Sequence, residues 1–218
     1  MDQEYFGPSS PEFQNMADAL LVVEDKQLPV HKAILAASSP TFATLFTSCA
    51  ATTTEDGRPT IPLDDSLHSV CATLRYLYHG CTKLKTTKLQ SFDDAYLVIT
   101  FAHKYNMRGL LEECEADLVG QAMAPNKFFG QPGTCVRWTL LAEKCEMSTF
   151  LAHCEQYMAQ RTDEAFWSSP GEKAVQLSST SLLRMLKASS YHNVHRHLAP
   201  LKKFVAWQQD EQQTCCSS

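Results

Sequence analysis

The segment Asp18–Phe42, "DALLVVEDKQLPVHKAILAASSPTF", contains the signals for a β-hairpin followed by two short helices. Leu20–Val23 is a short apolar run, and Glu24–Lys26 is a polar stretch that suits a turn. Apolar and other residues then alternate over Gln27–Val30, as in a half-buried strand. Pro29 has no backbone donor, which favours the edge of a sheet or the end of a strand. The segment therefore predicts a hairpin whose second strand is peripheral.

A helical period begins at His31. Ile34 and Leu35 follow it by three and four residues, and the alanines around them favour a helix. Ser39 suits the N-cap and Pro40 the first position of a second helix, so the first helix is expected to stop there. The apolar face of the second helix is expected to contain Phe42, Leu45 and Phe46.

Strands and helices alternate further along the chain. A polar loop over 49–59 is expected to precede a brief strand at Thr60–Leu63, and Asp64, Asp65 or Ser66 to cap the next helix. Gly80 suits the C-cap of that helix, and a short extended piece is expected around 82–84. Later helical patterns cover about 92–105, 107–121, 134–146, 148–161 and 179–190. The fold class is therefore α+β, followed by an all-α extension.

Composition shifts divide the chain into five parts. They are a loose arm over 1–15, a domain over 16–122, a linker rich in proline and glycine over 123–133, a helical region over 134–200 and a tail over 201–218. An internal similarity joins the two folded parts: Phe101–Val119 and Leu141–Ala159 are identical at six of nineteen positions. This offset of 40 residues predicts one helix pair used twice, with Met107 or Met147 at its corner. Independent patterning of two helix pairs is the alternative.

The composition is that of an intracellular globular protein. In 218 residues, 44% are hydrophobic and 20% charged, and the net charge of −5 argues against nucleic acid or an anionic membrane as partner. The first residues lack the pattern of a secretory signal, and no apolar run approaches the roughly 20 residues of a membrane span. The number of cysteines, nine, is odd, so reduced thiols are expected.

No motif predicts catalysis or a cofactor. His31-Lys32 has no nucleophile close in sequence, and no Gly-x-Ser-x-Gly elbow is present. Residues 192–197, "HNVHRH", present three histidines with metal-ligand spacing but no clear fourth ligand, so no metal is predicted. The end of the sequence, "CCSS", has the layout of a prenylation box but lacks aliphatic residues and follows an acidic stretch. A metal- or lipid-linked protein therefore stays a minor alternative to a non-enzymatic interaction protein.

Several of these features in order resemble the BTB/POZ domain. They are Asp18 with the hairpin, "VHKAILAASSPTF", "IPLDD", "LRYLYHG" and "AHKYNMRGLLEECEADL". The later stretch "TLLAEKCEMSTFLAHCEQYM" is similar to the helical 3-box or BACK-like region that follows BTB domains in adaptors. The resemblance implies a homodimer that acts as substrate adaptor of a cullin-3 E3 ubiquitin ligase and so promotes ubiquitination of an unknown protein.

The resemblance also implies two sets of site residues. The dimer interface and its charged pocket would involve Asp18, His31, Lys32 and Phe42, with His31 as a structural residue at the hairpin–helix junction. The cullin-binding face would involve Phe46, Glu55, Tyr105, Asn106 and Met107.

The sequence departs from the cullin-binding pattern in one place. Cullin-binding members often carry a hydrophobic-x-Glu motif after the second short helix, and here Glu55 follows Thr53. No MATH, kelch, zinc-finger or ankyrin segment for substrate capture is recognisable. The alternative is therefore a BTB oligomerisation scaffold, for transcription or assembly, that does not bind a cullin.

Overall fold

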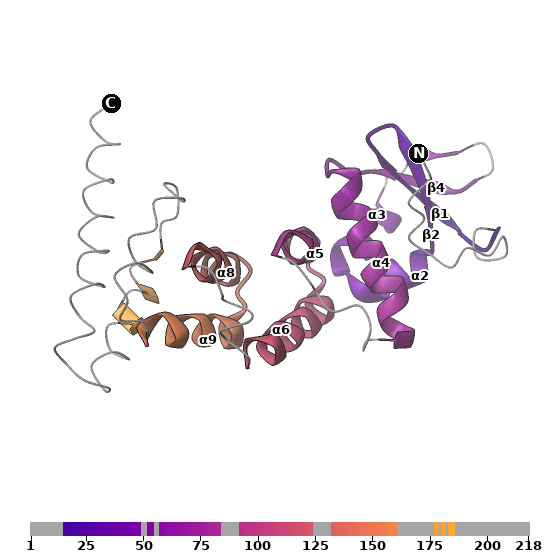
Figure 1. Ribbon diagram of the computed structural model, residues 1–218. Helices are drawn as coiled ribbons and strands as arrows, with labels where there is room; N and C mark the ends of the chain where they lie inside the picture. The colour runs from indigo at the N-terminus through magenta and orange to yellow at the C-terminus, as the bar shows by residue number, and fades with distance from the viewer. Residues whose placement is uncertain are drawn as a thin grey trace, which may run out of the picture. The chain divides into compact units, whose positions relative to one another are not determined.

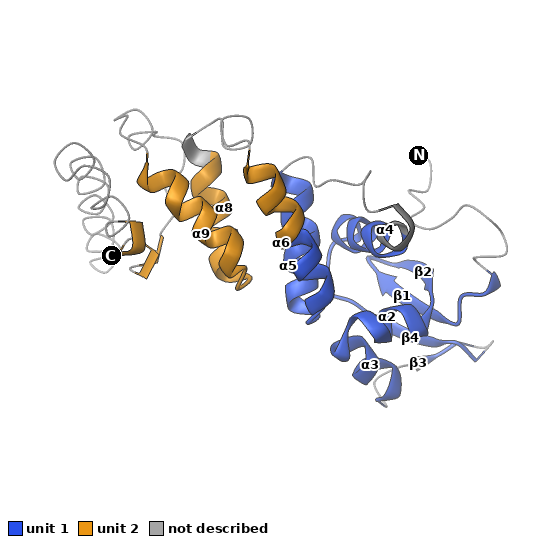
Figure 2. Ribbon diagram, turned by 90° about the horizontal axis from the view of Figure 1, so that it is seen from below, with its two compact units in different colours: residues 1–114 blue, residues 115–218 orange. Residues whose placement is uncertain are grey.

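The computed structural model (Figure 1) describes residues 15–48, 52–54, 57–83, 92–123, 132–160, 177–178, 180–181 and 183–185. The chain forms two compact units, residues 1–114 and 115–218, which Figure 2 colours separately. The division falls within helix α6, Arg108–Ala122, so this helix contributes residues to both units.

The first unit contains a four-stranded sheet with the order β2-β1-β4-β3. Its strands are β1 Ala19–Val23, β2 Lys26–Val30, β3 Thr52–Thr53 and β4 Pro59–Pro62. The central strand β1 pairs antiparallel with β2 and parallel with β4, and β3 is antiparallel to β4. The hairpin predicted from Asp18–Phe42 is therefore confirmed.

The backbone angles of two residues define the type of the hairpin turn, and one proline accounts for the edge position of β2. Glu24 and Asp25 have φ angles of 48° and 65°, the left-handed conformation of a type I′ hairpin turn. Pro29 lies in β2, which is an edge strand, as its missing N–H predicts. Most of β1 is buried, whereas only Val30 of β2 is fully covered. The sheet therefore has its core around β1.

Helices complete the first unit in the predicted order. They are α2 Lys32–Ser38, α3 Pro40–Thr47, α4 Leu67–Lys83, α5 Phe92–Lys104 and the start of α6. Ser39 is the N-cap of α3 and accepts a 3.0 Å hydrogen bond from the Phe42 N–H, with Pro40 in the first turn, as predicted. Of the three candidates before α4, Ser66 makes the cap, because its Oγ accepts from the Ser69 N–H at 3.2 Å.

Four expectations for the first unit were wrong in detail. The polar loop predicted over 49–59 contains β3, which pairs with β4, and β4 begins one residue earlier than expected. Gly80 does not end its helix, since α4 continues to Lys83, and residues 82–83 are helical instead of extended. Glycine inside a helix costs only about 1 kcal/mol, and the packing of α4 against α5 offsets such a cost.

The second unit contains the repeated helix pair that the internal similarity predicts. Helix α8, Pro132–Lys144, packs against α9, Ser148–Ala159. In both pairs the residue before the corner methionine is left-handed, with φ of 52° at Asn106 and 58° at Glu146. The N–H groups of Met107 and Met147 donate to the carbonyl five residues earlier, at 2.8 and 2.9 Å. The same corner is therefore built twice.

None of the described helices combines the length and the hydropathy that a membrane span requires. Five cysteines in the described part of the chain are buried free thiols: Cys71, Cys114, Cys135, Cys145 and Cys154.

Candidate protein-interaction surfaces

Asp18 and Lys32, the predicted charged-pocket residues, lie together at the start of α2. The Lys32 backbone N–H donates to Asp18 Oδ1 at 2.7 Å, and Lys32 Nζ lies 3.9 Å from Asp18 Oδ2. The N-cap residue of α2, His31, makes no side-chain capping bond, so Asp18 supplies the carboxylate at this helix start. The side chains of Lys32 and Asp18 are 40% and 50% exposed, so the pair is open to solvent in a single chain. Its place in a charged pocket beside a dimer interface stays a prediction.

His31 joins the hairpin to helices on both sides. Its carbonyl accepts from the N–H groups of Ile34 and Leu35 in the first turn of α2. Its own N–H donates to the hydroxyl of Tyr78 on α4 at 3.0 Å, and Nδ1 lies 3.2 Å from the same oxygen. These contacts agree with a structural residue at the hairpin–helix junction.

Phe42 packs in the core of the first unit. It is fully buried, and its ring stacks on Tyr105 at 4.8 Å and on Phe101 at 6.4 Å between centroids. Phe46 is half-buried, with its ring 6.2 Å from that of Phe42. The apolar face of α3 turns inward at Phe42, and its place at the dimer interface stays a prediction.

The corner between α5 and α6 exposes one of its three predicted contact residues. Asn106 is exposed, whereas Tyr105 is 7% and Met107 0% exposed. Tyr105 and Met107 are therefore core residues of the corner, and their contact with a partner stays a prediction. Glu55 lies outside the described residues.

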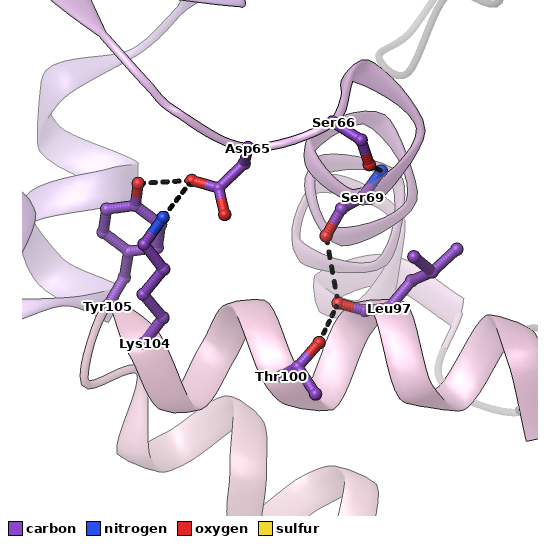
Figure 3. Close-up of polar contacts among 7 residues, drawn as sticks. All are labelled: Asp65, Ser66, Ser69, Leu97, Thr100, Lys104 and Tyr105. Carbon is purple, nitrogen blue, oxygen red and sulfur yellow. Dashed lines mark hydrogen bonds and ion pairs between the residues drawn. The ribbon is translucent and has the colours of Figure 1, made fainter.

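A polar cluster holds the corner in place (Figure 3). The Tyr105 hydroxyl donates to Asp65 Oδ2 at 2.5 Å, and Lys104 Nζ lies 2.8 Å from the same oxygen. Burial, followed by the hydrogen bond to Asp65, raises the pKa of Tyr105 far above its ordinary value, so the hydroxyl stays a donor. On the opposite side, Ser39 Oγ donates to the Tyr105 carbonyl at 2.5 Å.

Sequence reasoning missed this role of Asp65. The residue was a candidate helix cap, and its partners Lys104 and Tyr105 are 39 and 40 positions away. No local pattern marks a contact over that distance.

Carboxylates organise the second unit. Glu115 Oε1 accepts from the N–H groups of Thr149 and Phe150 at 2.7 and 2.9 Å. Glu155 is 5% exposed and accepts from Ser181 Oγ at 2.5 Å, and a second short contact joins Ser181 Oγ to Glu143. Burial raises the pKa of Glu155, the Ser181 hydrogen bond and Arg184 oppose the shift, and Glu143 adds to it.

The two motifs considered for a metal and for lipid attachment cannot be placed in the described part of the chain. No group of three or more His, Cys, Asp or Glu side chains among the described residues could hold a metal ion. The candidate histidines at 192, 195 and 197 and the final "CCSS" lie outside the described residues.

A family model identifies the domain that these strands and helices form. The model for the BTB/POZ domain matches residues 9–122, more than half of the sequence. The chain belongs to the BTB/POZ domain family. The predicted α+β fold and the resemblance on which it rested are thereby confirmed.

Curated relatives are also BTB proteins. Kelch repeat and BTB domain-containing protein 4 of Mus musculus is 29% identical over 160 residues, which cover 71% of this chain and 27% of that protein. Its Homo sapiens counterpart is 30% identical over 149 residues, covering 66% and 25%. BTB/POZ domain-containing protein 9 of Drosophila melanogaster is 34% identical over 97 residues, covering 44% and 13%. The alignments thus span about a quarter or less of these relatives' own lengths.

Proposed function

We propose that this chain is a homodimeric substrate adaptor of a cullin-3 E3 ubiquitin ligase. One observation carries the proposal. The likeness to the human kelch and BTB protein runs over 149 residues, which is longer than the BTB match over 9–122. The shared part therefore includes sequence beyond the BTB domain, in keeping with an adaptor in which a helical region follows that domain.

The start of α2 is the proposed dimer surface. Asp18 and Lys32 face solvent in one chain and compensate each other's charge at 3.9 Å. A symmetric partner chain would bury both charges together. Removing either residue of a buried ion pair leaves the other charge uncompensated, which destabilises the interface. Lys32→Ala would leave Asp18 without its cation at that surface, so we expect the dimer to weaken, measured as a lower mass by light scattering at micromolar concentration. An unchanged mass at all concentrations would contradict this assignment.

The corner at Asn106 is the proposed cullin-facing surface, with Phe46 and Glu55 as further members. Asn106 is exposed and left-handed, and two buried residues, Tyr105 and Met107, flank it. Transient interfaces combine such fixed exposed polar groups with an apolar centre, which half-buried Phe46 supplies here.

The second corner of the chain provides a matched pair of variants. Glu146 occupies the position equivalent to Asn106 with nearly the same φ, so the backbone of this corner accommodates glutamate. Asn106→Glu therefore changes the charge of the proposed cullin face and should keep the left-handed backbone of the corner. Glu146→Asn is the reciprocal control. We expect the first variant to weaken binding at least tenfold and the second to leave it unchanged.

Calorimetry of the purified chain with the N-terminal region of cullin-3 tests the proposal. Binding at micromolar concentration or tighter, reduced by Asn106→Glu alone, is the expected result. A folded dimer that shows no binding would refute the adaptor and favour the alternative, a BTB oligomerisation scaffold. The specific observation in favour of that alternative is Thr53, which lies in β3 where cullin-binding members often carry a hydrophobic residue.

A further inference from the structure

We propose that Asp65 is a positioning residue for the partner-facing corner, acting through Tyr105 on Asn106. The proposal rests on the proposed function for the identity of the partner, but its physical core is a property of the chain alone. Asp65 lies between β4 and α4, and its side chain is 14% exposed, so it is poorly placed to contact a partner itself.

One oxygen of Asp65 holds two consecutive residues at the end of α5. Oδ2 accepts the Tyr105 hydroxyl at 2.5 Å and lies 2.8 Å from Lys104 Nζ (Figure 3). Lys104 also lies 5.2 Å from the centroid of the Tyr105 ring, a cation–π distance. Hydrogen bonds to a charged group are stronger than neutral ones, so this attachment ties the β4–α4 connection firmly to the corner.

Tyr105 is fixed from two further directions. Ser39 Oγ donates to its carbonyl, one of the last carbonyls of α5 that lack a partner within the helix. Its ring contacts those of Phe42 and Phe101, with centroids 4.8 and 4.5 Å away. The hydroxyl, the carbonyl and the ring are thus held by three different parts of the first unit.

Immobilising Tyr105 fixes the exposed residue that follows it. Asn106 has a left-handed backbone, which is an uncommon conformation for a residue with a side chain. Its N–H donates to the His103 carbonyl at 3.1 Å, and the Met107 N–H donates to the Ala102 carbonyl at 2.8 Å. A released Tyr105 would let these bonds open, and the corner would then be competent for binding only part of the time.

This mechanism predicts an effect on association instead of dissociation. If the partner binds only chains whose corner is ordered, opening the corner lowers the fraction of chains that can bind. The apparent affinity falls in proportion to that fraction. A residue in direct contact with the partner would mainly change the dissociation rate. The two roles therefore separate kinetically.

The test compares Tyr105→Phe and Asp65→Ala with the control Thr100→Val. Tyr105→Phe keeps the stacked ring and removes only the hydroxyl. Thr100→Val also removes one hydroxyl, but this hydroxyl donates to the Tyr96 carbonyl at 2.6 Å and not to Asp65. Two quantities are measured: amide exchange at Asn106 and Met107 in the free chain, and the association and dissociation rates with the N-terminal region of cullin-3.

We expect both test variants to exchange these two amides about tenfold faster than the wild type, with helicity unchanged. The association rate should fall in proportion to the fraction of molecules whose corner is ordered. The control should match the wild type in each measurement. Should Asp65→Ala fail to fold, Tyr105→Phe decides the question alone.

Unchanged exchange in Tyr105→Phe would overturn the positioning role, as would faster exchange with unchanged association. A variant Lys104→Ala that reproduces the whole loss through faster dissociation would assign the effect to direct contact by Lys104 and overturn the proposal too. A wild-type chain that does not bind cullin-3 refutes the proposed function, and the exchange measurement still decides whether Asp65 orders the corner.

Discussion

Glu115→Ala should destabilise the second unit because Glu115 caps a helix from outside it. Helix α9 begins after Met147, whose side chain makes no capping hydrogen bond. Glu115 Oε1 instead accepts from Thr149 and Phe150, the second and third residues of α9, at 2.7 and 2.9 Å. Its negative charge also lies at the positive end of the helix dipole.

The size of the effect follows from these two bonds. Loss of an N-cap side chain costs about 1 kcal/mol, and a favourable charge at a helix start adds about 0.3–1 kcal/mol. Thr149 is exposed, so water replaces the lost partner there, whereas Phe150 is fully buried and its N–H is harder to solvate. We therefore expect the free energy of unfolding to fall by about 1–2 kcal/mol.

Urea denaturation followed by circular dichroism measures the change, with Glu113→Ala as the matched control. Glu113 lies on the same helix α6 and is exposed, so both variants change helix propensity equally. Glu115→Gln keeps an acceptor without the charge and should fall between them. Equal midpoints for Glu113→Ala and Glu115→Ala would refute the capping role, because the two variants differ only in the α9 contacts.

Three further predictions concern stability, pH and thiol chemistry. Ser39→Ala should lower the thermal midpoint by the equivalent of about 2–3 kcal/mol, since α3 loses its cap and the Tyr105 carbonyl its donor; an unchanged melting curve would contradict this. Burial raises the pKa of Glu155, so the folded state favours its neutral form. The free energy of unfolding should therefore fall as the pH rises above about 4.3, the pKa of an ordinary glutamate in the unfolded chain. The fall should end once the pH exceeds the raised pKa of Glu155 in the folded chain. Urea midpoints should show this decline in the wild type and lose it in Glu155→Gln, and the same slope in both would exclude Glu155 as the cause. Burial raises the pKa of Cys145 to about 11, so alkylation at neutral pH should be at least tenfold slower in the folded chain than in urea, and equal rates would count against it.

Features set by neighbouring residues could be predicted from the sequence. The turn before Lys26, the cap at Ser39 and the helix after it depend on the conformational preferences of a few adjacent side chains. The repeated corner was predicted from the matched spacing around Met107 and Met147, and both copies have the same hydrogen bonds.

Features set by distant contacts could not be predicted in this way. Periodicity marks Phe42 as apolar, but it does not say whether the chain itself or a second copy covers that face; the rings of Phe101 and Tyr105 cover it. Likewise, the carboxylate of Asp65 is one of several at a helix start, and only the fold brings α5 to it. The sequence thus marks which side chains are apolar or charged, and the packing decides which of them face outward.

Pro29 in β2 has a consequence for the resistance of this protein to aggregation through its sheet edges. Free sheet edges can recruit strands from neighbouring molecules and start fibre-like aggregates, and natural sheets block them with proline or very short strands. Here one edge strand carries Pro29 and the other, β3, is two residues long. Neither edge offers a continuous ladder of donors and acceptors to a stray strand. Under the proposed function, the dimer would then form through helical surfaces, without continued growth by strand addition.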